Sequence, residues 1–274
     1  MVKIAAFLQL YNESSNGHLV RCLNNCAQWA DDIFIYDDCS TDDSEEIYKR
    51  YTDNVILGQK RDFVNELFHK QDLLEFAQTS NPDWIIWQDG DAILSRDLTR
   101  DLRDMLSDMG KYDGLRVHYM NLWRHPAFQR LDHGFDSLAP LMAWKNKSTL
   151  RYEPVKGLHR RQYPKGITKS RNVSDNYRVL HYGFASEYWI VKKYLTYKSH
   201  GQWGDNLRRL VDETTSFRLE KVPKEMFPEG NLPLDYDTVS PPEPITYDQY
   251  KSYKSWEEYE SNSSGNGLQV PELP

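Results

Sequence analysis

Two carboxylates two residues apart, Asp89 and Asp91, follow a strongly apolar run and have a glycine between them. Carboxylate oxygens are the ligands that Mg²⁺ and Mn²⁺ take in proteins, and a glycine leaves room for a ligand to approach closely. A divalent cation can lie between an acidic site and the negative diphosphate of a nucleotide. Asp-x-Asp triplets also arise by chance, so the metal-site hypothesis depends on the secondary-structure elements that position this one.

Polar residues follow two further apolar runs of the chain. Tyr11, Asn12 and Glu13 follow the first run, Asp37-Asp38 follows the second, and Gln88 directly precedes Asp89. In an open parallel sheet, ligands bind at the carboxyl ends of the strands, so we expect these side chains to line one crevice. Neither Gly-x-Gly-x-x-Gly nor a Gly-Lys-Ser/Thr loop occurs, which excludes both glycine-rich modes of nucleotide binding. The sequence therefore predicts metal-assisted binding of a diphosphate.

The elements that must position these residues alternate along the first 120 positions. Continuous apolar runs are typical of parallel strands buried on both faces, and helical periodicity between them predicts an α/β fold. The expected strands are 2–10, 33–36, 55–57, 84–87 and 115–120, and the expected helices begin after Gly17, begin near Asp42 with a capping box to Glu45, and span 63–79 and 97–109.

The alternation fails from Trp123 onward, where aromatic, basic and short apolar pieces mix. We expect added strands at 138–144, 149–152 and 177–184 and a helix at 186–197. After residue 232 the chain is rich in Pro, Tyr, Glu and Ser, so we expect an extended or disordered tail over 233–274.

Composition narrows the classes of partner. The formal net charge of −7 argues against a general nucleic-acid binder, which needs a basic face to neutralise phosphates. No apolar stretch approaches the roughly 20 residues that span a bilayer, so we expect a soluble cytoplasmic protein without a transmembrane segment.

The three strand ends together resemble a known family. Tyr11-Asn12-Glu13, the stretch from Asp37 to Asp42 and the stretch from Asp83 to Asp91 are similar to the family-2 glycosyltransferases of the GT-A fold. The resemblance implies a Rossmann-like, mostly parallel sheet flanked by helices. It further implies a nucleotide-sugar-binding half at 1–120 and a smaller mixed region on the acceptor side at 121–232.

The resemblance also implies roles for individual residues. Tyr11, Asn12, Glu13 and Asp38 would cradle the nucleoside, with Gln88 and Asp89 on the nucleotide side. A basic residue before the Asp-x-Asp strand would approach the nucleotide, and we choose Lys70 over Arg61. The metal, Mn²⁺ or Mg²⁺, would be held by Asp89, Asp91 and a late histidine. His181 in Leu-His-Tyr-Gly matches that histidine, with a satisfied core histidine as the alternative.

An inverting reaction needs a carboxylate to take the proton of the acceptor hydroxyl. The candidates are Asp132, Asp136 and Glu153, and we choose Asp136 because it precedes an apolar run among aromatics. The chain lacks the Glu-Asp pair seen in many family members, which leaves the base and inversion open. Trp123, Trp144 and Trp203 could stack on sugar rings, and the alternative role for each is core packing. The basic cluster of Lys156, His159, Arg160, Arg161, Lys165, Lys169 and Arg171 suits an anionic acceptor or a solvated surface.

The predicted activity is hexosyl or deoxyhexosyl transfer from a UDP-, GDP- or dTDP-sugar to a hydroxyl of a glycan, lipid or protein-linked sugar. A sugar nucleotidyltransferase would need an early basic, glycine-rich loop, which Tyr11-Asn12-Glu13 does not supply. A phosphatase with Asp37 as nucleophile would need Asp-x-Asp at that position. A non-catalytic carbohydrate-binding or scaffold protein on the same fold is the remaining alternative.

Overall fold

The computed structural model describes residues 1–132, 134–136, 139–153, 155, 162–201, 205–211, 213, 217–263 and 268–270. The chain divides into two compact units. The first comprises Met1–Tyr119 and Ala139–Val179, and the second comprises Met120–Leu138 and Leu180–Pro274.

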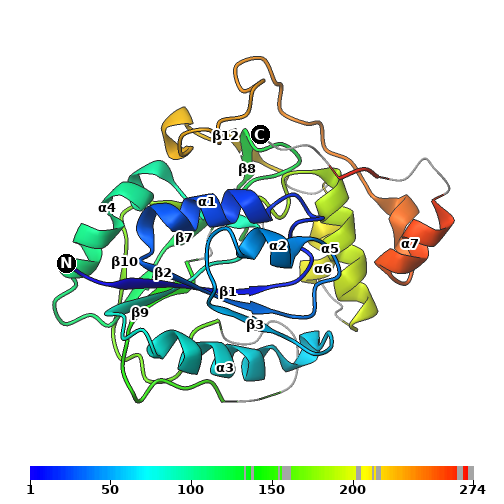
Figure 1. Cartoon of the computed structure of the whole chain (residues 1–274). Helices are drawn as coiled ribbons and strands as arrows, with labels where there is room; N and C mark the ends of the chain where they lie inside the picture. The colour runs from blue at the N-terminus through cyan, green and yellow to red at the C-terminus, as the bar shows by residue number, and fades with distance from the viewer. Residues whose placement is uncertain are drawn as a thin grey trace. The chain divides into compact units, whose positions relative to one another are not determined.

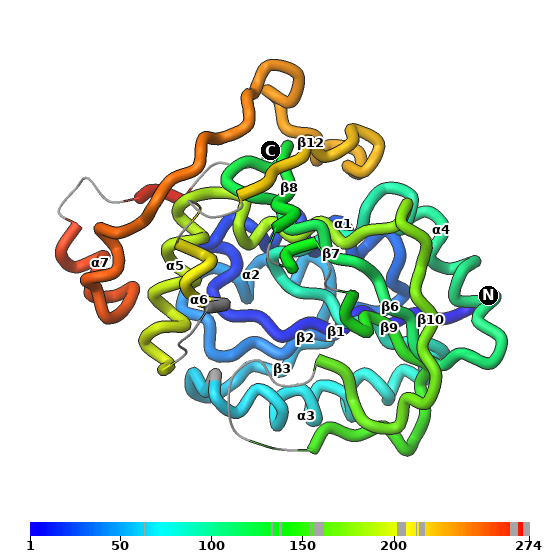
Figure 2. The backbone as a smooth tube through the Cα atoms, turned by 180° about the vertical axis from the view of Figure 1, so that it is seen from behind, coloured from blue at the N-terminus to red at the C-terminus, as the bar shows by residue number. Residues whose placement is uncertain are grey.

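A central sheet flanked by helices makes up most of the first unit (Figures 1 and 2). Its strand order among the described residues is β10-β6-β9-β4-β1-β2-β3. All of its pairings are parallel except those of β9, which runs antiparallel to both β4 and β6. The prediction of a mostly parallel α/β sheet is therefore confirmed. The strands are β1 Ile4–Leu10, β2 Asp32–Asp37, β3 Val55–Leu57, β4 Trp84–Trp87, β6 Gly114–Arg116, β9 Leu141–Lys145 and β10 Ser170–Asn172.

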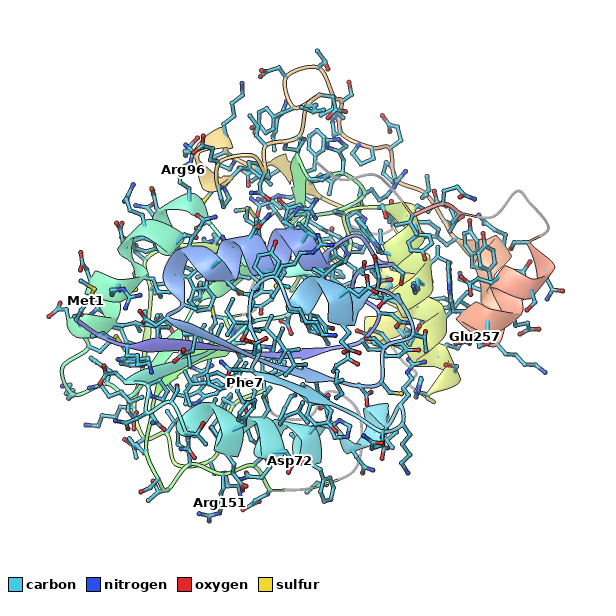
Figure 3. All side chains as sticks on the ribbon, in the orientation of Figure 1. Met1, Phe7, Asp72, Arg96, Arg151 and Glu257 are labelled. Carbon is cyan, nitrogen blue, oxygen red and sulfur yellow. The ribbon has the colours of Figure 1, made fainter. Side chains whose placement is uncertain are left out.

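Helices cover both faces of this sheet, as Figure 1 shows. One face packs against α1 (Leu19–Trp29) and α4 (Arg96–Ser107) in a single apolar cluster. The other face packs against α3 (Glu66–Gln78), which follows the short turn η1 (Phe63–Asn65). Phe7, labelled in Figure 3, lies on the α3 side of β1 and contacts Trp87 and Trp144. The central strands are thus buried on both faces, as their continuous apolar runs predict.

Two local expectations are corrected. The run 115–120 is divided between β6, which ends at Arg116, and β7 (His118–Asn121), which belongs to a different sheet; β6 also shifts its register against β9 between Leu115 and Arg116. The capping box at α2 (Ser44–Tyr48) is absent: Asp42 accepts the amide of Ser44, but Glu45 pairs with Lys49 instead of reaching back.

A smaller sheet of order β5-β11-β7 contains β5 (Ala92–Leu94) and β11 (Arg178–His181), and the division between the units falls within β7 and β11. The expected strand at 149–152 does not form in the described structure. Arg151 makes only an isolated bridge with Lys165.

The second unit contains a two-stranded antiparallel sheet and several helices, including one close to the chain end. Ser186 caps α5 by accepting the amide of Trp189, and Ser255 caps α7 by accepting that of Glu258. None of the helices in the described ranges is long and apolar enough to cross a membrane. The elements are β8 Phe128–Arg130, α5 Glu187–Ser199, α6 Asp205–Val211, β12 Leu219–Lys221, η2 Lys224–Met226, η3 Asp248–Ser252 and α7 Trp256–Asn262.

Candidate active site at the carboxyl edge of the sheet

The three polar strand ends meet at one edge of the first unit. Leu10 at the end of β1 is in register with Asp37 at the end of β2, and the amide of Asp38 donates to the Leu10 carbonyl at 2.8 Å. The end of β4 is held likewise, since the Gln88 amide donates to the Phe7 carbonyl at 3.1 Å. Parallel pairing of β4, β1 and β2 therefore brings their polar ends to one edge of the sheet, where the sequence predicts a ligand crevice.

The Asp-x-Asp turn packs directly against the loop after β1. A Cβ atom at Gly90 would lie 2.8 Å from Cγ of Glu13 and 2.7 Å from Cδ2 of Leu10, so only glycine fits without displacing them. The structure thus brings Glu13 beside the Asp89-Gly90-Asp91 turn. Gln88 is buried, and its side-chain amide donates to the carbonyls of Asp89 and Ala92, which fixes the turn from within.

Each carboxylate oxygen of Asp89 accepts a hydrogen bond. The indole N–H of Trp87 donates to Oδ1 at 2.8 Å, and the hydroxyl of Tyr119 donates to Oδ2 at 2.6 Å. Burial and the neighbouring Asp89 carboxylate raise the pKa of Tyr119 well above its ordinary value. Tyr119 is not among the site residues expected from the sequence, where its only signal is its place near the end of an apolar run.

Asn12 joins the loops after β1 and β2. Its φ of 51° lies in the left-handed region, its backbone amide donates to Ser40 Oγ at 2.8 Å, and its side-chain oxygen accepts the Thr41 amide at 2.8 Å. Cys39 in the facing loop also has a positive φ, 64°. Non-glycine residues rarely adopt this region unless surrounding contacts hold them there, and such positions often cluster at functional sites.

The predicted nucleoside side of the crevice contains Asp38 and Tyr11. Asp38 is 3% exposed, its Oδ1 accepts the Asp62 amide at 2.9 Å, and His69 lies 3.8 Å away. Burial raises the pKa of Asp38, although the Asp62 amide opposes this shift. The Arg61 guanidinium lies 4.0 Å from the centre of the Tyr11 ring. Arg61, the alternative to Lys70, therefore lies beside a predicted nucleoside residue.

Lys70 is 2% exposed. Its ammonium lies 4.5 Å from the centre of the Trp87 ring and 3.8 Å from Glu66. Burial lowers the pKa of Lys70, while the charges of Glu66 and Asp89 oppose that shift. The lysine is therefore buried between Glu66 and the ring of Trp87, the last residue of β4.

His181 belongs to the second unit, where its ring orientation is fixed. Its Nδ1 lies 2.6 Å from the Oδ1 of Asn121, whose amide nitrogen donates to the Phe135 carbonyl. Since the Asn121 oxygen can only accept, Nδ1 carries the proton and Nε2 has the lone pair. Lys193 Nζ lies 3.3 Å from Nε2. A metal-binding histidine typically donates its other ring N–H to an acceptor, as His181 Nδ1 does to Asn121.

The carboxylates considered as catalytic bases differ in their surroundings. Asp132 accepts from the buried Arg130 guanidinium and from the Arg218 amide, so it has a structural role. Glu153 pairs with Lys165. Asp136 in the second unit is exposed. Asp136 therefore stays the predicted base.

The structure describes only some of the tryptophans considered for sugar stacking and of the basic residues considered for an anionic acceptor. Trp123 and Trp144 are fully buried and pack in the cores of their units, while Trp203 lies outside the described residues. In the basic cluster, residues 156, 159, 160 and 161 also lie outside them. Lys165 and Lys169 line a cavity of about 390 Å³ together with Arg116.

The donor set fits a divalent cation that also binds a substrate. In the described ranges, no three or more His, Cys, Asp or Glu side chains form a group that could hold a metal ion. Mg²⁺, however, is usually bound by one or two carboxylates plus substrate phosphates rather than by a complete protein cage. Asp89 and Asp91 would supply two such carboxylates at this edge of the sheet, and the diphosphate would supply further ligands beside the predicted His181.

The chain was compared with solved structures and with curated proteins. Two S. aureus TarS structures show weak similarity. TarS 1–349 in complex with UDP-GlcNAc is 17% identical with a TM-score of 0.37, over 44% of this chain and 35% of that one. TarS itself is 12% identical with a TM-score of 0.45, over 76% and 42%. The chain thus spans about a third of the TarS 1–349 chain in the first match. No match was found among curated proteins.

The family model described as Glycosyl transferase family 2 matches residues 7–163, which is more than half of the chain and includes all three strand ends. The chain therefore belongs to glycosyl transferase family 2.

Proposed function

We propose that this family-2 glycosyltransferase moves a hexosyl or deoxyhexosyl group from a nucleoside-diphosphate sugar to a hydroxyl acceptor with inversion. The observation that supports this most is the convergence of Glu13, Asp38 and Asp89-Gly90-Asp91 at the carboxyl ends of three parallel strands. An acidic crevice of this kind suits a diphosphate only with a divalent cation between them.

Each group has a defined role in this proposal. Asp89 and Asp91 would hold Mn²⁺ or Mg²⁺ at the diphosphate, with His181 as a further ligand, and Asp38 with Tyr11 and Asn12 would bind the nucleoside. When bound there, the cation would offset the negative charge of the leaving nucleoside diphosphate. Asp136 takes the proton of the acceptor hydroxyl, which belongs to a glycan, a lipid or a protein-linked sugar.

A screen of nucleotide-sugars tests the activity itself. Among UDP-, GDP- and dTDP-sugars, we expect the protein to hydrolyse those of one nucleoside, measured as release of the nucleoside diphosphate. Hydrolysis should require Mn²⁺ and should stop when EDTA removes it. Water then replaces the acceptor. If all three classes stay intact and none of the nucleotides binds, the protein is a non-catalytic member of the family.

Asp136→Asn tests the proposed base. We expect this variant to hydrolyse the preferred donor about 10²- to 10⁴-fold more slowly, the usual contribution of a general base, with unchanged nucleotide affinity. Asp175→Asn is the control, because Asp175 is exposed and pairs only with Arg178 on its own turn among the described contacts. Equal rates for wild type and Asp136→Asn would remove Asp136 from this role.

A further inference from the structure

Both oxygens of the Asp89 carboxylate accept hydrogen bonds from side chains of the protein itself. Trp87 donates its N–H to Oδ1 and Tyr119 donates its O–H to Oδ2. Hydrogen bonds to an ionised acceptor are shorter and stronger than those between neutral groups, and the 2.6 Å contact of Tyr119 is of this kind. We propose that Tyr119 and Trp87 are positioning residues that fix the direction in which Asp89 presents its remaining lone pairs to the metal and diphosphate. This inference rests on the proposed function.

Lys70 contacts Trp87, one of the two donors to Asp89. Its ammonium lies against the face of the Trp87 ring, while the edge of the same ring carries the N–H that bonds to Asp89. A cation on the face draws electron density from the indole, which makes the N–H a better donor, and linked polar contacts in a buried site strengthen one another. Glu66 keeps Lys70 in place from the same helix. Lys70 therefore acts on Asp89 through the Trp87 ring.

Fixed orientation matters because the cation has few protein ligands here. An aspartate free to rotate about its side-chain bonds would lose that freedom on binding, which weakens the interaction. With both oxygens already bonded, Asp89 keeps one orientation before the ligand arrives.

Tyr119→Phe tests the inference, with Tyr177→Phe as a matched control. Tyr177 is also partly buried and donates its hydroxyl to an aspartate, Asp101 on α4, at 3.1 Å. Calorimetric titration with UDP, GDP and dTDP, each with and without Mn²⁺, gives the metal-dependent affinity. Loss of an outer partner of a metal ligand typically costs 10- to 100-fold, so we expect Tyr119→Phe to weaken the Mn²⁺-dependent affinity by about that factor. Metal-free affinity and the behaviour of Tyr177→Phe should match wild type.

A purely structural role for Tyr119 predicts a different result. In that case Tyr119→Phe would lower the thermal midpoint, or would weaken nucleotide binding equally with and without Mn²⁺. Either result, without a loss specific to Mn²⁺-dependent binding, overturns the inference. If Tyr119→Phe does not fold, Trp87→Phe removes the other donor while keeping a ring above Lys70, and the same loss is expected. A wild-type protein that binds none of the three nucleotides with Mn²⁺ overturns the proposed function and the inference together. Unchanged Mn²⁺-dependent affinity in both variants overturns the inference alone.

Discussion

Replacing Asp91 with alanine is expected to abolish Mn²⁺-dependent binding of the preferred nucleoside diphosphate. Asp91 and Asp89 are the two carboxylates of the turn, so the variant removes half of the proposed protein charge that faces the cation. Loss of an outer partner alone costs 10- to 100-fold in comparable sites, so loss of a ligand should cost at least about 100-fold. Calorimetry with UDP, GDP and dTDP, with and without Mn²⁺, measures the change.

Asp43→Ala controls for the general loss of negative charge. Asp43 is exposed at the start of α2 and its side chain makes no capping hydrogen bond. We expect it to bind as wild type does, with the folded state of Asp91→Ala confirmed by its thermal midpoint. Equal Mn²⁺-dependent affinity in Asp91→Ala and wild type would refute the metal assignment at this turn.

The same titration tests His181. Its Nε2 lone pair is fixed by the Asn121 contact, so His181→Ala should weaken Mn²⁺ binding while leaving the fold intact. His200→Ala is the control, because His200 is exposed at the end of α5. An unchanged Mn²⁺ titration would return His181 to a structural role within the second unit.

Glu213→Leu is expected to lower the free energy of unfolding by about 3–5 kcal/mol, the usual cost of removing one partner of a buried ion pair. Glu213 is 1% exposed and accepts from three donors: the Trp123 indole N–H at 2.6 Å, the Arg124 guanidinium at 3.1 Å and the Ile245 amide at 3.1 Å. Leucine would leave the Trp123 indole N–H and the Ile245 amide without this acceptor, while Arg124 would keep the Glu243 carbonyl. Unsatisfied buried groups carry their own penalty.

Urea denaturation, followed by tryptophan fluorescence, measures this loss. Glu220→Leu is the matched control, because Glu220 is exposed on β12 and its only described side-chain partner is a 3.5 Å contact from Gln129. We expect a change within about 0.5 kcal/mol for that surface site. A Glu213→Leu protein as stable as Glu220→Leu would show that Glu213 does not hold the C-terminal stretch at Ile245.

The sequence was informative where burial alone decides the structure. The runs that became β1, β2 and β4 are apolar on both faces, and parallel pairing then requires their polar ends to meet, so Asp38 and Asp89 could be placed together. Strand β9 could not be oriented in this way, because an apolar run carries no direction. The division of 115–120 depends on pairing with strands distant in sequence, β9 and β10 for β6 and β11 for β7, which no local pattern encodes.

The same limit applies to the side chains that support the site. Tyr119 meets Asp89 across 30 positions of sequence, and spacing does not predict a contact of that range. For Lys70 a signal did exist: it lies three residues after Leu67 and three before Leu73, on the buried face of α3. A lysine on the apolar side of a helix needs a partner within the core, which here is Glu66 together with the Trp87 ring.

The two outer strands of the central sheet, β3 and β10, are each three residues long. Outer strands have backbone groups to which another chain can add a strand, and long, flat, apolar ones promote aggregation. Here β10 reads Ser-Arg-Asn, with a charged side chain at its centre, and β3 ends after Leu57. The sheet therefore offers a second molecule little length for edge-to-edge pairing, which favours solubility of the folded unit at high concentration.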